Sequence, residues 1–303
     1  MWCQPSPKVR LIETKSPKKH LMSYSPESRN SVAELVIEPG RVERQYWSDL
    51  WNYRELFYFL AWRDLLVRYK QTVVGVTWAV IRPLLTMLVL TFVFGKLAGM
   101  PSGGVPYPIL VFCGMLPWQF FAAALSESGN SLVANSGMIS KIYFPRLIVP
   151  ASSVITSFAD FLISAVLMGC LMIYYQFSPS PRILVLPLFV LLTLAAAIGA
   201  GLWISALMVR YRDFRIIVPF VVQFGLYVSP VGFSSKAVPE QWRLIYSINP
   251  MAGVIDGFRW AILGGDNTVY VPGLLLSAAG ISLVIASGIW YFRKTERTFA
   301  DVI

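Results

Sequence analysis

Charged side chains stand inside otherwise apolar stretches of this sequence, and their chemistry is the first clue to function. Arg82 and Asp160 each lie well inside such a stretch, and Asp256 and Arg259 lie three residues apart in another. An ion away from water is costly, so each should meet a partner or a wet cavity. Asp256 and Arg259 can pair along one helix face. For Arg82 and Asp160 two interpretations stay open: a polar contact facing a conduit, or a structural pair between helices.

Residues suited to covalent or metal chemistry are sparse. The three cysteines have no metal-like spacing and the single histidine is His20, so neither a zinc site nor a disulfide framework is predicted. The sequence has no D-x-D motif, and Gly95-Lys96 is the nearest fragment of a phosphate-binding G-x-x-x-x-G-K-[ST] loop. We therefore predict no catalytic residue, no metal site and no cofactor in this chain. Any energy from ATP must come through another chain.

Composition places the charged residues in a membrane. The chain of 303 residues is 56% hydrophobic and 14% charged, whereas soluble domains carry about 25% charged residues. We predict an all-α integral membrane protein. The net charge of +10 could suit nucleic acid, but most cations lie in a tail or beside apolar runs, where membrane orientation requires them. Nucleic-acid binding is therefore not expected.

Six apolar runs qualify, some only just, for the ~20 residues that a helix needs to cross a bilayer. They are residues 73–97, 107–125, 147–175, 183–209, 216–233 and 270–292. The fifth is short and contains two prolines. Residues 1–45, rich in Pro, Ser and Lys, are expected to be a flexible tail, and we see no apolar core of a cleaved export signal in them. Residues 46–303 are expected to form the membrane domain.

The connecting segments predict the orientation. Eleven cations flank the runs on one side and five on the other, and the richer side should face the cytoplasm. Both termini and the segment KIYFPRLIVP (141–150) are then cytoplasmic. The simplest interpretation of this segment is a loop that rests on the lipid surface, in which Lys141 and Arg146 only fix the membrane topology.

Two further segments are apolar but too broken to span. Residues 53–70 mix Trp, Tyr and Arg with Leu and Phe, which suits a helix lying in the headgroup region. Residues 234–265 are divided by Pro239 and Pro250 into two short pieces. We expect these pieces to be re-entrant helices on the outer side, buried in protein or facing a cavity.

Five motifs, taken in order, resemble one family. They are WRDLLVRYKQTVVGVTWAVIRPLL (62–85), ISKIYFPRLIVP (139–150), VRYRDFRIIVPF (209–220), NPMAGVIDGFRWAILG (249–264) and the terminal RKTERTFADVI. Together they are similar to the membrane subunit of ABC-2-type exporters of bacterial surface polysaccharides: O-antigen, capsule and teichoic acid. The resemblance covers about residues 50–303. Arg82 departs from it, because an uncharged polar residue such as Gln is expected there.

The resemblance implies a homodimer in the bacterial inner membrane that moves a lipid-linked polysaccharide. Two copies of a cytoplasmic subunit would bind ATP and magnesium. A short helix at about residues 137–145, ended by Pro145, would dock into that subunit. Its contact residues would be Ile139, Lys141, Ile142, Tyr143, Phe144 and Arg146.

Two more sets of residues are expected on the substrate path. Residues 234–265 would close the outer mouth at rest, with Asn249 capping a helix that starts at Pro250 and with Gly253 and Gly257 packing closely. The residues of this outer gate are Trp242, Pro250, Asp256, Arg259 and Trp260. Candidates for the conduit wall are Trp78, Arg82, Trp118, Phe121, Asp160 and Tyr227. Aromatic rings there could stack on sugars, although membrane-interface belts use the same residues.

Other functions fit the sequence less well. An ABC-2 exporter of a drug or small lipid fits the spans, but the outer NPM and FRW motifs argue against it. A membrane glycosyltransferase would need a carboxylate cluster on a sizeable soluble face, which the sequence lacks. A proton-coupled flippase would need more spans than six.

Overall fold

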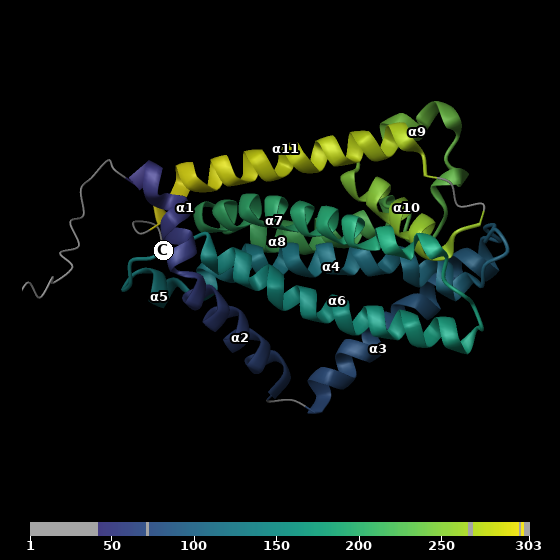
Figure 1. Cartoon of the computed structure of the whole chain (residues 1–303), viewed down its shortest axis with the longest axis horizontal. Coiled ribbons are helices and arrows are strands. Elements are labelled where there is room, and N and C mark those ends of the chain that lie inside the picture. Colours follow the sequence, from purple (N-terminus) through teal and green to yellow (C-terminus); the bar gives the residue numbers. More distant parts are fainter. Residues whose placement is uncertain (1–41, 71–72, 266–268, 297, 300–303) are drawn as a thin grey trace, which may run out of the picture. The chain divides into compact units, whose positions relative to one another are not determined.

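The computed structural model describes residues 42–70, 73–265, 269–296 and 298–299. By its internal contacts the chain divides into two units, Met1–Val42 and Glu43–Ile303. The described residues lie almost entirely in the second unit, and among them every regular element is a helix (Figure 1). The expected tail lies outside the described residues up to residue 41, and a helix already begins at Val42.

The helices follow one another with short connections. In chain order they are α1 Val42–Asn52, α2 Arg54–Lys70, α3 Val73–Leu90, η1 Thr91–Leu97, α4 Tyr107–Ala134, α5 Ser136–Ile139, α6 Ile148–Tyr174, η2 Pro181–Val185, α7 Leu186–Arg210, α8 Phe214–Val228, η3 Ser235–Ala237, α9 Glu240–Tyr246, α10 Pro250–Leu263 and α11 Val271–Glu296. The π-helix η1 continues α3, and the 3-10 helix η2 leads into α7.

Five segments in the described part of the chain are long and apolar enough to cross a membrane. They are Thr77–Leu97, Tyr107–Ala134, Ile148–Tyr174, Pro181–Arg210 and Val271–Glu296. The fifth expected span, residues 216–233, corresponds to the 15-residue helix α8. At 1.5 Å per residue it is ~22 Å long, shorter than the ~30 Å hydrocarbon core.

A proline ends α8 early. Ser229 precedes Pro230 and has extended backbone, with φ −80° and ψ 152°. Proline disfavours helical backbone at the residue before it, so the helix stops at Val228. The chain then turns directly into the segment that precedes η3.

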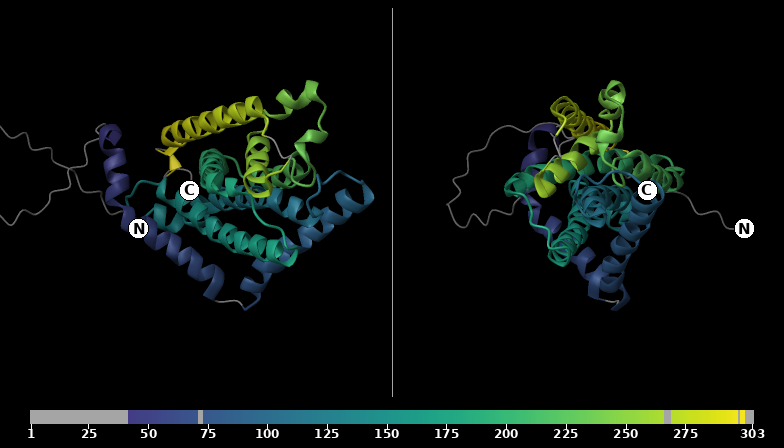
Figure 2. Two further views of the ribbon diagram at one scale, coloured as in Figure 1. Left: turned by 45° about the vertical axis from the view of Figure 1, so that its right-hand side comes forward. Right: turned by 90° about the vertical axis from the view of Figure 1, so that its right-hand side faces the viewer.

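Helix α4 forms the centre of the packing. The helices α11, α7, α4, α6 and α2 contact one another in that order, and α10 packs against α4, α7 and α11. Figures 1 and 2 show α11 and the α2–α3 pair on opposite sides of α4. Most of α4 is buried, including five consecutive residues from Ile109 to Cys113. A helix that is apolar all round is expected to lie in such a core.

Small residues bring α7 and α11 close together. A Cβ on Gly199 would overlap the backbone of Ile285, and one on Gly288 would overlap Gly199. Close approach through small residues is typical of helices packed in membranes. Near one end of this contact the rings of Trp203 and Tyr291 stack, with their centroids 4.1 Å apart.

Candidate functional sites

The predicted contact helix at residues 137–145 is wrong in extent. Helix α5 covers only Ser136–Ile139, and residues 140–147, here called the connecting loop, run from it to α6. The β-branched Ile142 and the aromatic Tyr143 and Phe144 are poor helix formers, and Pro145 disfavours helical backbone at Phe144. One turn of helix followed by a loop is the result.

The connecting loop buries some of its predicted contact residues and exposes others. Ile139 and Phe144 are 5% and 4% exposed and pack in a cluster with Leu60 and Phe292. They are core residues of this chain, so they are not free to contact a partner. Ile142 and Tyr143 are 59% and 65% exposed. Lys141 is also exposed.

Arg146 anchors the loop to the end of α11. Its backbone N–H donates to Glu296 Oε1 at 2.8 Å, and its guanidinium donates to the Glu296 carbonyl at 2.5 Å. Tyr46 from α1 donates to Glu296 Oε2 at 3.0 Å, and the guanidinium lies 6.0 Å from the centre of the Phe299 ring. Tyr46, Glu296 and Phe299 were not among the expected contact residues. The position of Glu296 just after the last apolar run does not indicate from sequence that it contacts Arg146.

Asp160 lies in an ion pair that joins three helices. Its carboxylate accepts from Arg68 Nη1 at 2.6 Å and from the Tyr69 hydroxyl. Arg68 Nη2 lies 2.6 Å from Glu127 Oε1. This group of side chains ties α2 to α4 and α6. Such an arrangement fits the interpretation of Asp160 as part of a structural pair between helices. Beside it lies a cavity of about 540 Å³, also lined by Arg63 and Thr156.

The other candidates for the conduit wall do not gather in one cavity. Arg82 and Trp78 are exposed on α3 and Tyr227 is exposed on α8. No ion pair of Arg82 occurs within the described residues. Trp118 is buried instead, against Gly225 of α8, and its ring centre lies 5.9 Å from that of Phe121.

The segment between α8 and α11 folds back into the helix packing. The Asn249 side chain accepts from the Met251 N–H at 3.1 Å, so it caps α10 as expected, with Pro250 in the first turn. Gly257 lies against the Phe189 ring and Gly253 against Ser277, and neither site has room for a Cβ. Helix α10 is therefore mostly buried.

The two tryptophans of this segment differ. Trp242 on α9 is exposed, whereas Trp260 on α10 is partly covered. The Arg182 guanidinium lies 5.3 Å from the centre of the Trp260 ring, and the Phe189 ring packs edge-on against it.

The predicted pair of Asp256 and Arg259 is wrong. Arg259 is 2% exposed and donates to the carbonyls of Val231 at 2.8 Å and Phe233 at 2.6 Å. Asp256 accepts from Ser235 Oγ at 2.5 Å. No salt bridge joins the two among the residues that the structure places. The break after α8 leaves carbonyls without helical partners, and Arg259 satisfies two of them.

Charge still connects the two residues at longer range. Burial raises the pKa of Asp256, while the hydrogen bond from Ser235 and the positive charge of Arg259 lower it. Burial lowers the pKa of Arg259, and the charge of Asp256 raises it.

The five long apolar helices among the described residues define a multi-pass helical membrane protein. Residues 55–263 match the ABC-2 type transporter family. The chain belongs to this family.

Named relatives extend the match beyond those residues. An O-antigen export system permease protein RfbA of Klebsiella pneumoniae is 27% identical over 256 residues, which cover 82% of this chain and 95% of the relative. RfbA of Myxococcus xanthus is 26% identical, covering 84% and 98%. The polysialic acid transport protein KpsM of Escherichia coli is 20% identical, covering 67% and 79%. The chain is thus similar to polysaccharide export permeases along most of its length.

Proposed function

We propose that this chain is the membrane subunit of an ATP-driven exporter of a lipid-linked bacterial surface polysaccharide. The observation that carries the proposal is the similarity to relatives named as O-antigen export permeases, over 95% and 98% of their own lengths. Two copies of the chain would work with two copies of a cytoplasmic subunit that binds ATP and magnesium. The complex would lie in the bacterial inner membrane.

The excess of cations on one side supports an orientation with the connecting loop and both termini in the cytoplasm. Helices α9 and α10 then lie toward the outer side. This agrees with the course of α4, which starts at Tyr107 beside the segment after α8 and ends next to α5. Helix α2, with exposed Tyr58, Phe59 and Trp62, would lie along the cytoplasmic membrane surface.

The tip of the connecting loop would contact the ATP-binding subunit. Ile142 and Tyr143 offer exposed apolar and aromatic surface, and the Arg146–Glu296 contacts hold the base of the loop. Aromatic anchors on a fixed support are typical of residues that dominate binding energy. Motion in the ATP-binding subunit could then reach α6 and α11 directly.

The conduit would form between two copies of the chain. Helices α3 and α8 make few contacts within the chain and expose large apolar side chains. These include Trp78, Leu85, Leu88 and Phe92 on α3 and its continuation η1, and Ile216, Phe220, Phe224 and Tyr227 on α8. Arg82 would then face the second copy or the polymer. Helix α10 would help to close the outer mouth at rest.

Deleting the gene in its host tests the proposal. We expect the surface polysaccharide to disappear and the lipid-linked polymer to accumulate inside the cell. An ATP-binding subunit that cannot hydrolyse ATP should give the same phenotype. If the polymer is no longer made at all, the glycosyltransferase alternative holds. If the surface polymer is unchanged, the proposal is wrong.

A further inference from the structure

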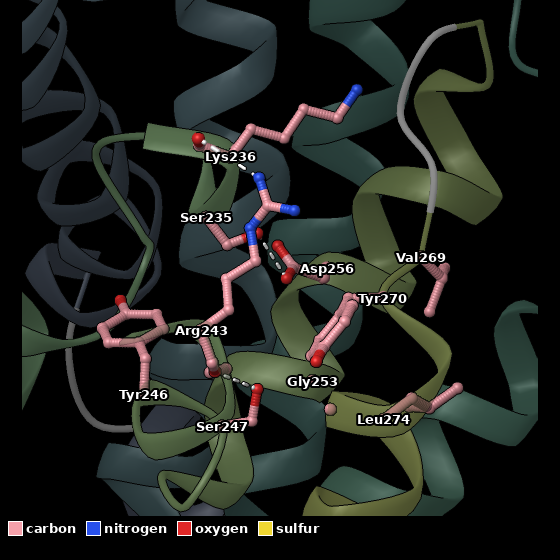
Figure 3. A pocket seen from close by; sticks show the side chains of 12 residues that line it. Ser235, Lys236, Arg243, Tyr246, Ser247, Gly253, Asp256, Val269, Tyr270 and Leu274 are labelled. Carbon is pink, nitrogen blue, oxygen red and sulfur yellow. Dashed lines mark hydrogen bonds between the residues drawn. The ribbon is translucent and has the colours of Figure 1, made fainter. Parts of the chain in front are cut away.

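A polar cavity of about 180 Å³ lies between α9, α10 and the start of α11. Figure 3 shows its lining, to which Arg243 contributes from α9, Asp256 from α10 and Tyr270 from the residue just before α11. We call it the Asp256 pocket. It is separate from the exposed faces of α3 and α8.

The pocket has groups that both donate and accept hydrogen bonds. Asp256 lies at its inner wall and takes one hydrogen bond, from Ser235 Oγ. A carboxylate has about four acceptor positions, so most of its capacity is open to a ligand. Arg243 donates from one nitrogen to the Lys236 carbonyl at 3.5 Å. A guanidinium has five N–H donors, and the others can serve a ligand.

Aromatic side chains give the pocket its flat surfaces. Tyr246 lines it with its ring, while its hydroxyl donates to the Val228 carbonyl at 2.8 Å. Tyr270 stands at the opposite side, and its hydroxyl has no hydrogen-bond partner within the described residues. An amphipathic ring can pack on an apolar face and offer a hydroxyl at its edge.

The combination favours a neutral, hydroxyl-rich ring over an anion. Arg243 and Lys236, which both line the pocket, would attract a phosphate, but the carboxylate of Asp256 at the inner wall would repel it. A sugar ring offers hydroxyls that both donate and accept, together with an apolar face. The volume lies below the ~300–1,000 Å³ of pockets for larger ligands, so the pocket suits one ring at a time.

We propose that the Asp256 pocket binds a single sugar ring of the exported chain at the outer side of the transporter. This inference rests on the proposed function for the origin of the sugar. Asp256 accepts hydroxyl hydrogens, and Arg243 donates to ring or hydroxyl oxygens. Tyr270 packs on the ring, and its hydroxyl forms a hydrogen bond with the sugar.

The test is protection of a cysteine at the pocket rim. Val269→Cys is introduced into full-length protein that lacks Cys3, Cys113 and Cys170, and its rate of labelling by an impermeant maleimide is measured in detergent. The probes are the methyl glycosides of glucose, galactose, mannose, rhamnose and N-acetylglucosamine. At tenfold excess over its dissociation constant, a bound glycoside should slow labelling about tenfold. Ser178→Cys, exposed outside the pocket, should be unaffected.

Two variants link the protection to the pocket. Asp256→Asn keeps the shape but weakens acceptance, and Tyr270→Phe removes only the hydroxyl. Each should shift the protecting concentration about tenfold upward, as expected for the loss of about 1.4 kcal/mol of binding. Protection by inorganic phosphate or pyrophosphate, and by no glycoside, would overturn the sugar assignment. Absence of protection by every probe would overturn the pocket itself.

The pocket and the proposed function can fail separately. If deletion of the gene abolishes surface polysaccharide but no glycoside protects Val269→Cys, the export function stands and the pocket inference is wrong. If glycosides protect the cysteine but deletion leaves the surface polymer unchanged, the sugar site stands and the export function is wrong.

Discussion

Arg259 is a buried cation whose direct partners are backbone carbonyls. Its guanidinium holds Val231 and Phe233, which follow the end of α8, against α10. It also fills the space beside Gly114 of α4, where a Cβ would lie 2.8 Å from Nη2. One side chain therefore fixes three parts of the chain, and its third nitrogen, Nε, makes no hydrogen bond within the described residues.

Arg259→Met should destabilise the protein strongly. The change removes two hydrogen bonds to a charged group, each worth about 1.5–3 kcal/mol, and leaves two carbonyls unsatisfied. We expect a fall of about 3 kcal/mol or more in the free energy of unfolding, seen as a lower melting temperature in detergent. Arg243→Met, at a partly exposed cation, is the matched control and should change little. Equal melting of both variants would contradict this account of Arg259.

At the scale of elements, the sequence predicts spans well where composition alone decides them. The run 147–175 became Ile148–Tyr174, and the run 270–292 became Val271–Glu296. Helix α4 continues past the end of the apolar run at residue 125, as far as Ala134, because polar residues continue a helix where it leaves the apolar layer. The run 216–233 does not form one helix, because Pro230 disfavours helical backbone at the residue before it, whatever the average hydropathy of the run.

The sites were harder to predict than the spans. The family resemblance implied a contact segment near residue 142, but not that Ile139 and Phe144 would point into the chain's own core. The partners of Arg259 are carbonyls that become available only when α8 ends and the chain turns back. Such contacts depend on tertiary structure, so residue spacing alone does not reveal them.

The connecting loop allows a sharp contrast between its exposed and buried residues. Ile142→Asp and Tyr143→Asp place a charge on the exposed tip, so the protein should fold and melt normally but lose co-purification with the proposed ATP-binding subunit. Ile139→Asp and Phe144→Asp bury an unpaired charge, so they should lower the melting temperature or the yield. Normal association and export in both tip variants would refute the contact role.

The packing of α10 can be tested through its glycines. Gly257→Ala should destabilise the protein by about 1–3 kcal/mol, because the new methyl group overlaps the Phe189 ring. Gly280→Ala in α11 is the control, since nothing lies within 4 Å of the place that its Cβ would take. It should be neutral, or stabilising by about 0.5–1 kcal/mol. Melting in detergent measures both, and a harmless Gly257→Ala would show that α10 is loosely packed.

At the scale of the whole molecule, the exposed faces of α3 and α8 lead to a prediction about assembly. In a background without native cysteines, Leu85→Cys on α3 and Phe220→Cys on α8 should form cross-links between copies in the membrane. Leu275→Cys, which is also well exposed but lies on α11, is the control and should react much less. Stronger cross-linking at Leu275 than at the other two would place the interface elsewhere.

The anchoring of the connecting loop also has a consequence for biosynthesis. Arg146 and Glu296 are 150 residues apart, so the ribosome completes the loop long before it makes the loop's anchor. Until α11 is finished, the loop lacks the contacts that position Ile142 and Tyr143. Recruitment of the proposed ATP-binding subunit should therefore begin only after the last span is made. Nascent chains stalled before residue 296 should fail to capture that subunit, whereas chains stalled beyond residue 303 on a linker should succeed.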